Sequence, residues 1–74
     1  MALLRLPEVM KRTGLGRSTV YAEVARRRFP SPVRLTARSV GWVESEVVDW
    51  IDQRIRDRID MKHVNQLVGV DEAP

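Results

Sequence analysis

The sequence lacks cysteine altogether and contains a single histidine, His63, among its 74 residues. Without cysteine, disulfides, zinc ribbons and thiolate catalysis are excluded, and one histidine does not make a metal site. Long apolar runs are also absent, because Arg5 and Pro7 interrupt the apolar start "MALLRLPEV" before it reaches the length of a signal-peptide core or a membrane span. These absences predict a cytoplasmic protein with no cofactor, no metal and no membrane partner.

The residue groups that catalysis requires are missing as well. A chain of 74 residues buries only about 60% of its unfolded surface, so its core is small and an active-site cleft of ordinary size is not expected. No glycine-rich phosphate loop follows a strand, no paired carboxylates share a pocket, and neither Ser18 nor Ser39 has a histidine base in the same module. The sequence therefore predicts a protein that is not an enzyme, with no small-molecule ligand evident.

Charge is distributed unevenly along the chain. Residues 1–43 carry nine Lys/Arg against two Glu, a net charge of +7, whereas residues 44–74 carry four Lys/Arg against eight acidic residues, a net charge of −4. A basic half joined to an acidic half indicates one surface that faces a polyanion and another that faces away from it. Charge alone is equally compatible with an ordinary solvated surface.

A short helix is expected over residues 7–13. Pro7 suits the first turn of a helix, where its missing N–H is not needed, and Glu8 favours the positive helix end. Val9 and Met10 supply an inward face before the Thr-Gly pair at 13–14 ends the helix after barely two turns.

A three-residue turn and a second helix follow. Gly14 can adopt a left-handed conformation without steric cost, Leu15 can insert into the core, and Gly16 is an acceptable N-cap for a helix over residues 17–27. Two short helices joined by a glycine-containing turn are typical of the helix-turn-helix.

The second helix has an apolar side and a polar side. At about 100° per residue, Val20 and Val24 form the buried stripe. A helix that enters the major groove needs hydroxyls for base edges or phosphates, a small residue for close approach, and an arginine for phosphate or guanine. The opposite side supplies these residue types as Ser18, Thr19, Ala22 and Arg26, flanked by Arg17 and Tyr21.

A β-hairpin is predicted after the second helix. The Pro-Ser-Pro segment at 30–32 forces an extended exit, because each proline fixes its own φ and biases the preceding residue away from helix. Residues 33–43 then read as two strands with a tip at 36–39. This hairpin forms a wing whose tip residue Arg38 is expected to contact phosphate, while Arg34 is as readily an ordinary strand-surface residue.

The last predicted helix begins near Glu44 and runs to about Arg58. Asp52 and Arg56 form a favourable i,i+4 pair on its surface. Trp42 in the hairpin and Trp50 in this helix are interpreted as core residues rather than stacking platforms for bases, because each lies in the apolar phase of its element. The predicted inner stripe consists of Val47, Val48, Trp50, Ile51, Ile55 and Ile59.

A family resemblance covers most of the chain, from about Leu3 to Arg58. It runs in order through "LLRLPEVMKRTGLGRSTVYAEVARRRFPSPV", "RSVGW" and "ESEVVDWI". These stretches resemble the AlpA-type phage and prophage regulators, relatives of the small excisionases with a MerR-like winged helix-turn-helix. The resemblance implies site-specific binding to double-stranded DNA through Arg17, Ser18, Thr19 and Tyr21, with Arg38 in the wing. Gly16 departs from the serine cap frequent in such proteins, which removes a side-chain cap and a phosphate contact with it.

We therefore expect a mainly α-helical fold with a small β-hairpin, a winged helix-turn-helix of three helices plus wing over residues 1–58. Residues 59–74 form a C-terminal tail, helical to about residue 68 and then frayed, in which Met61, Val64 and Val68 are candidates for contact with another copy. The expected function is transcriptional regulation of a prophage or mobile element. The alternatives are an excisionase acting with an integrase, and a protein-interaction module that uses the basic face.

Overall fold

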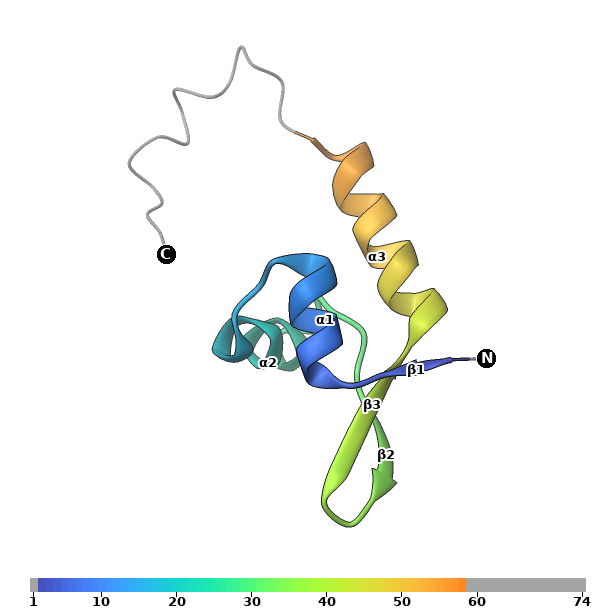
Figure 1. Ribbon diagram of the computed structural model, residues 1–74. Coiled ribbons are helices and arrows are strands. Elements are labelled where there is room, and N and C mark those ends of the chain that lie inside the picture. Colours follow the sequence, from blue (N-terminus) through green and yellow to red (C-terminus); the bar gives the residue numbers. More distant parts are fainter. Residues whose placement is uncertain (1, 59–74) are drawn as a thin grey trace.

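The structure is a computed structural model that describes residues 2–58, shown in Figure 1. The predictions for residues 59–74, including those for Ile59 and the tail, lie outside the described residues. The predicted winged helix-turn-helix is confirmed: residues 2–58 form three helices and a small antiparallel sheet whose β2–β3 hairpin projects away from the helices (Figure 1). The elements in chain order are β1 (Leu3–Leu4), α1 (Leu6–Thr13), α2 (Arg17–Ala25), β2 (Val33–Thr36), β3 (Ser39–Val43) and α3 (Glu44–Arg56).

The three helices lie where the sequence predicts them, with shifts at their ends. Pro7 lies in the first turn of α1, which begins one residue earlier than expected. Both α2 and α3 end two residues before the expected Arg27 and Arg58. The shorter α2 has a local cause, because the chain adopts a left-handed conformation at Arg27 (φ 60°) that no helix accommodates.

The sheet has one strand more than the sequence predicts. Strand β3 lies in the centre, between β2 and the unpredicted β1, and both pairings are antiparallel. Leu4 of β1 pairs with Trp42, so the start of the chain is held beside the hairpin. Gly41 is buried between the outer strands: a Cβ there would lie 3.1 Å from Leu35 Cδ1 and 3.3 Å from the Leu4 carbonyl oxygen. Glycine therefore permits the close approach of both outer strands to β3.

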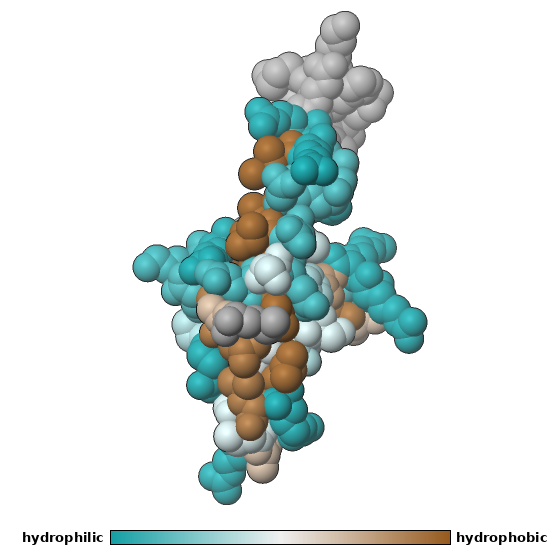
Figure 2. All heavy atoms as spheres, turned by 90° about the vertical axis from the view of Figure 1, so that its right-hand side faces the viewer, coloured by the Kyte–Doolittle hydropathy of each residue, from teal (hydrophilic) through white to brown (hydrophobic). Residues whose placement is uncertain are grey.

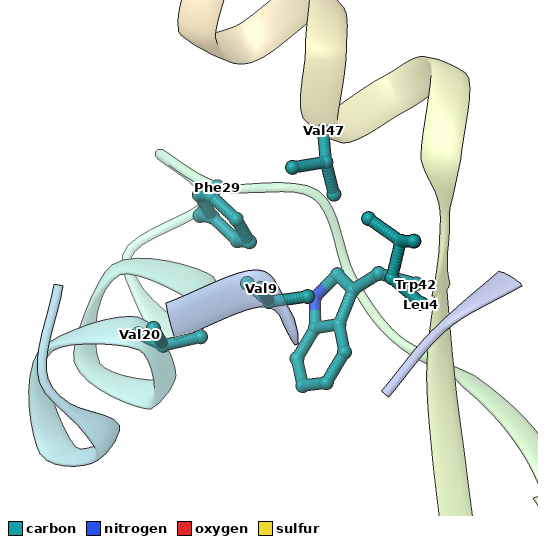
Figure 3. Packing of buried hydrophobic residues seen from close by; sticks show 6 residues of the cluster. All are labelled: Leu4, Val9, Val20, Phe29, Trp42 and Val47. Carbon is teal, nitrogen blue, oxygen red and sulfur yellow. The ribbon is translucent and has the colours of Figure 1, made fainter. Parts of the chain in front are cut away.

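The core lies where the helices meet the sheet, as Figure 3 shows. Trp42 is fully buried, as predicted, and its indole Nε1–H donates a hydrogen bond to the carbonyl oxygen of Pro30 over 2.8 Å. Satisfying the indole in this way lets the largest side chain of the core be buried without an unpaired donor. The buried side chains are Leu4, Val9, Val20, Phe29, Trp42 and Val47.

Phe29 and Trp50 close the core beside α3. Their ring centroids lie 4.9 Å apart in an edge-to-face arrangement, and Trp50 Nε1 donates to the carbonyl oxygen of Arg28 over 2.6 Å. Trp50 is half-buried, and Arg54 lies over its ring with the guanidinium carbon 5.3 Å from the centroid. These contacts attach α3 to the segment that follows α2.

The predicted inner stripe of α3 is wrong at two positions. Val47 is fully buried and Ile51 is half-buried, but Val48 and Ile55 remain 48% and 49% exposed. The core covers only a narrow side of α3, and the C-terminal half of the helix projects beyond the body of the domain (Figure 1). The predicted Asp52–Arg56 pair is present on the surface, with 2.9 Å between Nη2 and Oδ2.

Candidate functional site

The turn between α1 and α2 is built as its glycine predicts. Gly14 has a φ of 77°, and its N–H donates to the carbonyl oxygen of Met10 over 2.8 Å, which closes the left-handed end of α1. The Thr13 hydroxyl donates to the Val9 carbonyl oxygen over 2.8 Å and accepts from the Leu15 N–H over 3.2 Å. Leu15 packs against the core. The direction of α2 relative to α1 is thereby fixed by local hydrogen bonds and one apolar contact.

Helix α2 buries one side and exposes the other. Val20 is fully buried and Val24 packs half-buried against the core, as the helical wheel predicts. Ser18 and Thr19 are exposed, and within residues 2–58 neither hydroxyl makes a hydrogen bond, so both are available to an outside partner. Ala22 is half-buried, and it therefore contributes less solvent-facing surface than the wheel predicts.

Arg17 and Tyr21 lie on α2 toward the hairpin. Tyr21 is 39% exposed, and its ring centroid lies 6.0 Å from that of Trp42 at an interplanar angle of 57°. The core indole therefore supports one side of the tyrosine ring while the rest of the residue reaches solvent. Arg17 is exposed at the first position of α2, where the N-cap residue Gly16 supplies no side-chain hydrogen bond.

The end of α2 carries three consecutive arginines in a tight cap. The N–H of Arg28 donates to the Glu23 carbonyl oxygen over 2.8 Å and that of Arg27 donates to the Val24 carbonyl oxygen over 3.0 Å, the two bonds of a Schellman motif. Arg27 occupies the left-handed position that usually holds glycine. Arg26 is exposed, and its Nη1 lies 3.5 Å from Glu23 Oε2, so this predicted site residue is held by a long surface ion pair.

The hairpin presents Arg38 at its tip. Strands β2 and β3 pair through Arg34 opposite Val40, and the two hydroxyls of Thr36 and Ser39 lie 2.7 Å apart across the turn. The N–H of Arg38 donates to Thr36 Oγ1 over 3.2 Å, which fixes the backbone of the tip and leaves the side chain exposed. Arg34 instead donates from Nη1 to the carbonyl oxygen of Ala37 over 3.3 Å and thus bridges the turn.

A groove of about 530 Å³ connects the hairpin to the helices. It brings together three predicted site residues, Arg17, Tyr21 and Arg38, and adds one that the sequence analysis missed, Arg5. No local pattern marked Arg5, because its place beside the hairpin depends on β1 and on the start of α1. Ser18, Thr19, Ala22 and Arg26 do not line the groove, whose full lining is Arg5, Leu6, Pro7, Met10, Arg17, Tyr21, Arg38, Ser39 and Val40.

Arg12 differs from the groove arginines because it is engaged by two carboxylates. Its guanidinium lies 3.0 Å from Glu8 on the same helix and 3.1 Å from Glu44 at the start of α3. The pKa of Arg12 is raised above its usual value, and the largest cause is the hydrogen bond with Glu8. Desolvation lowers the pKa in part, and Glu44 raises it again through a hydrogen bond and its charge. Arg12 remains charged on both sides of neutrality, so this network connects α1 to α3 without introducing pH dependence there.

Two further features concern residues 2–58 as a whole. In this part of the chain no cluster of three or more His, Asp or Glu side chains has the arrangement of a metal site. None of the helices described there has the length and apolar character needed to cross a membrane.

Comparisons with known proteins identify relatives of this chain. Residues 2–55 match the sequence family described as prophage CP4-57 regulatory protein (AlpA). An uncharacterized protein of Enterobacteria phage P4, ORF88, is 46% identical over 55 residues, which cover 74% of this chain and 62% of that protein. The DNA-binding transcriptional activator AlpA of Escherichia coli (strain K12) is 37% identical over 60 residues, covering 73% of this chain and 86% of that protein. The chain thus spans less than two thirds of the phage P4 relative.

Proposed function

Because the chain belongs to the AlpA family of prophage regulatory proteins, we propose that it binds double-stranded DNA at specific sites and regulates transcription of a prophage or mobile element. In this proposal α2 lies in the major groove and the β2–β3 hairpin contacts phosphates beside it. The protein acts without chemistry, as a binding module in the cytoplasm, where the DNA of such an element is located. In this proposal residues 1–58 form the DNA-binding domain.

The observation that carries the proposal is the exposed side of α2. Ser18 and Thr19 stand free at the start of a helix whose opposite side is anchored by the buried Val20. In helix-turn-helix proteins the N-terminal residues of the second helix contact base edges. Arg17 and Arg38 flank this surface from α2 and from the hairpin, and both are exposed. The combination of free hydroxyls and flanking cations suits base edges between two rows of phosphates.

Each predicted site residue has a role in this proposal. Ser18 and Thr19 bond to base edges, while Arg17 and Arg38 bind phosphates. Arg26 exchanges its long contact with Glu23 for a phosphate or a guanine at the other end of α2. Ala22 permits close approach to the base pairs, and the hydroxyl of Tyr21 bonds to the sugar-phosphate backbone.

The excisionase alternative requires the same binding surface, since directing recombination also needs selective binding without chemistry. Footprinting on the DNA that flanks the coding region of this protein tests both functions in one experiment. Protection at a promoter supports regulation, and protection at an attachment site supports an excisionase acting with an integrase. Absence of any protected site would contradict site-specific DNA binding.

The alternative of a protein-interaction module makes a different prediction about salt. Binding to DNA releases counterions, so log K should fall linearly with log salt, with a slope that counts the phosphates contacted. A titration of a duplex at several NaCl concentrations measures that slope. A basic face that binds only an acidic protein would show weak duplex binding with no preference for the footprinted sequence over a random one.

A further inference from the structure

The groove of about 530 Å³ gathers arginines from three separate parts of the chain. Arg5 precedes α1, Arg17 opens α2, and Arg38 lies at the hairpin tip. All three side chains are exposed, and the groove lining includes no acidic residue. Three cations directed at one concave surface without a carboxylate create a local positive potential that favours an anion.

The three arginines of the groove are not engaged by other side chains of the described residues. Within residues 2–58, Arg5, Arg17 and Arg38 lie within 4.0 Å of no carboxylate oxygen, and their guanidinium groups donate no hydrogen bond to the protein. The arginines that do pair with carboxylates in this part of the chain are Arg12, Arg26, Arg54 and Arg56. The cations that line the groove are therefore free to bind an outside partner, and within residues 2–58 they are the ones that a single concave surface brings together.

Arg5 is held in place by its backbone rather than by its side chain. Its carbonyl oxygen accepts hydrogen bonds from the N–H groups of Glu8 and Val9, both over 3.0 Å, which fixes it at the first turn of α1. The preceding residue Leu4 is buried and pairs with Trp42 in the sheet. The fixed backbone limits the guanidinium of Arg5 to the region beside the groove, which removes the main-chain part of the entropic cost of binding.

The remaining walls of the groove fit a sugar-phosphate chain. The apolar residues Leu6, Met10 and Val40 lie beside the arginines, and Tyr21 adds a hydroxyl. A DNA strand alternates anionic phosphates with deoxyribose rings that offer apolar surface, whereas a simple inorganic anion needs only the cations. The mixed lining therefore favours a phosphodiester chain over an isolated anion.

We propose that this groove binds the backbone of one DNA strand, with Arg5 as a third phosphate-contacting arginine beside Arg17 and Arg38. The inference rests on the proposed function and extends it: the strand passes between α2 and the hairpin while α2 lies in the adjacent major groove. Phosphate contacts of this kind fix the orientation of the protein on the duplex and carry no sequence information of their own.

The test compares charge-removing variants at different places on the protein. Arg5→Gln, Arg17→Gln and Arg38→Gln are titrated with the footprinted duplex and with a random duplex over a range of NaCl concentrations. Each variant should weaken binding to both duplexes by similar factors and flatten the slope of log K against log salt by roughly one unit. Arg58→Gln removes the same charge two residues beyond the end of α3, outside the groove lining, and should leave the slope unchanged. Arg5→Lys keeps the charge and should retain the slope of the unmodified protein.

A second measurement locates the phosphates. Replacing single phosphates of the footprinted duplex by neutral methylphosphonates should weaken the unmodified protein at positions where an arginine binds. The affinity of Arg5→Gln should be unaffected by the methylphosphonate at one of these positions, which assigns that phosphate to Arg5. The phosphates assigned in the same way to Arg5, Arg17 and Arg38 should be neighbours on one strand. Partners on opposite strands would overturn the proposal.

The outcomes separate this inference from the proposed function. If the unmodified protein binds the footprinted duplex selectively but Arg5→Gln keeps its full salt slope, the groove assignment is wrong and the proposed function stands. If the unmodified protein binds no duplex, both fail. A folding defect is recognised from a lowered thermal midpoint of Arg5→Gln, and Arg5→Lys then decides, because a phosphate-binding cation predicts that its slope is preserved.

Discussion

At the scale of single residues, the polar groups of α2 differ in how freely they can meet a partner. Ser18 and Thr19 are exposed without hydrogen bonds in residues 2–58, whereas Arg26 is engaged by Glu23 at 3.5 Å. That contact is long and at the surface, where ion pairs contribute little, so a DNA phosphate or guanine can displace it. The three side chains can therefore be replaced without disturbing the core beneath them.

Replacing Ser18, Thr19 and Arg26 together by alanine should lower the affinity for the footprinted duplex. The expected loss is about 1–3 kcal/mol for each residue that reads a base in good geometry, because its hydrogen bonds to the base edge disappear. The measurement is the dissociation constant on specific and random duplexes at one salt concentration. Replacing the exposed α3 residues Ser45 and Arg56 by alanine serves as the control. Unchanged specific binding by a triple variant with a normal circular dichroism spectrum would contradict the role of α2.

At Arg27 we expect opposite effects of one substitution on stability and on DNA binding. A side chain at φ 60° is strained relative to glycine, so Arg27→Gly should raise the free energy of unfolding, by roughly 0.5–1 kcal/mol. In a domain of this size that corresponds to a rise of a few degrees in the thermal midpoint, with about 4–8 °C expected per kcal/mol. Arg26→Gly is the matched control and should lower the midpoint, because Arg26 has an ordinary φ of −87°. A lower midpoint for Arg27→Gly would mean that the arginine side chain stabilises the cap.

Duplex affinity completes the test of Arg27. The variant loses a cation at the end of α2, and its binding to any duplex should weaken while its fold becomes more stable. The left-handed backbone of Arg27 is thus the basis of our expectation that its side chain contacts DNA. Unaltered duplex affinity would show that Arg27 lies away from the DNA.

At the scale of elements, α3 shows how narrow the buried side of a helix is in so small a domain. Val47 and Val48 are neighbours in the chain, yet Val47 is fully buried and Val48 is 48% exposed. Val47→Ala should lower the free energy of unfolding by about 2 kcal/mol, because it removes buried methyl groups and leaves a cavity beside Trp42 and Phe29. Val48→Ala should change it by less than about 0.5 kcal/mol. Chemical denaturation of both variants measures the difference, and equal losses would contradict the observed packing.

The same helix shows what a sequence pattern predicts and what it leaves open. The periodicity of apolar residues shows which side of the helix is buried, so the burial of Val47 could be predicted. It does not show how wide the buried side is. The exposure of Val48 and Ile55 follows from tertiary packing, since α3 extends past the core. Strand β1 was missed for a related reason. Its two residues are too few to show the alternation of apolar and polar side chains that predicts a strand, and the strand is defined by its pairing with Val43 and Trp42.

Elements that depend on local chemistry were predictable. The left-handed Gly14 and the hairpin tip at Arg38 follow from turn-forming residues within a few positions of each other. Candidate residues of α2 could be found from the wheel because one helix carries them all. Arg5 could not be found in this way, because its place in the groove depends on the contact of α1, α2 and the hairpin. The burial of Phe29 could not be predicted either, because Phe29 lies between arginines and prolines and has no periodic apolar neighbours.

At the scale of the whole molecule, the side away from α2 has a different character from the candidate DNA surface. Figure 2 shows this side, where apolar surface extends along α3 and over the sheet. Leu3 and Leu35 lie side by side above Gly41, within 3.5 Å of the place a Cβ would take there. The exposed large apolar side chains on the strands and α3 are Leu3, Val33, Leu35, Val48 and Ile55. A protein bound to DNA through α2 keeps this side free.

One recognition helix and one wing contact only a few base pairs, and a single module of this kind buries about 600–1,000 Å² of protein surface on DNA. Useful selectivity then requires several copies on adjacent sites or a partner such as an integrase. We expect a protein that is mainly monomeric in dilute solution and occupies repeated sites cooperatively. The tail residues Met61, Val64 and Val68 are our candidates for the contact between copies, and they lie outside the described residues.

Cutting the chain after Arg58 tests this expectation and the extent of the domain together. Within residues 2–58 the buried core already joins all three helices to the sheet, so we expect the shortened protein to keep its fold and its affinity for a duplex with one site. It should lose the extra affinity that the full chain shows on a duplex with two adjacent sites. Binding isotherms on both duplexes, for full and shortened chains, measure the two effects separately. Cooperativity that survives the cut would assign the contact to the apolar side of residues 2–58, and collapse of single-site binding would mean that the tail belongs to the folded domain.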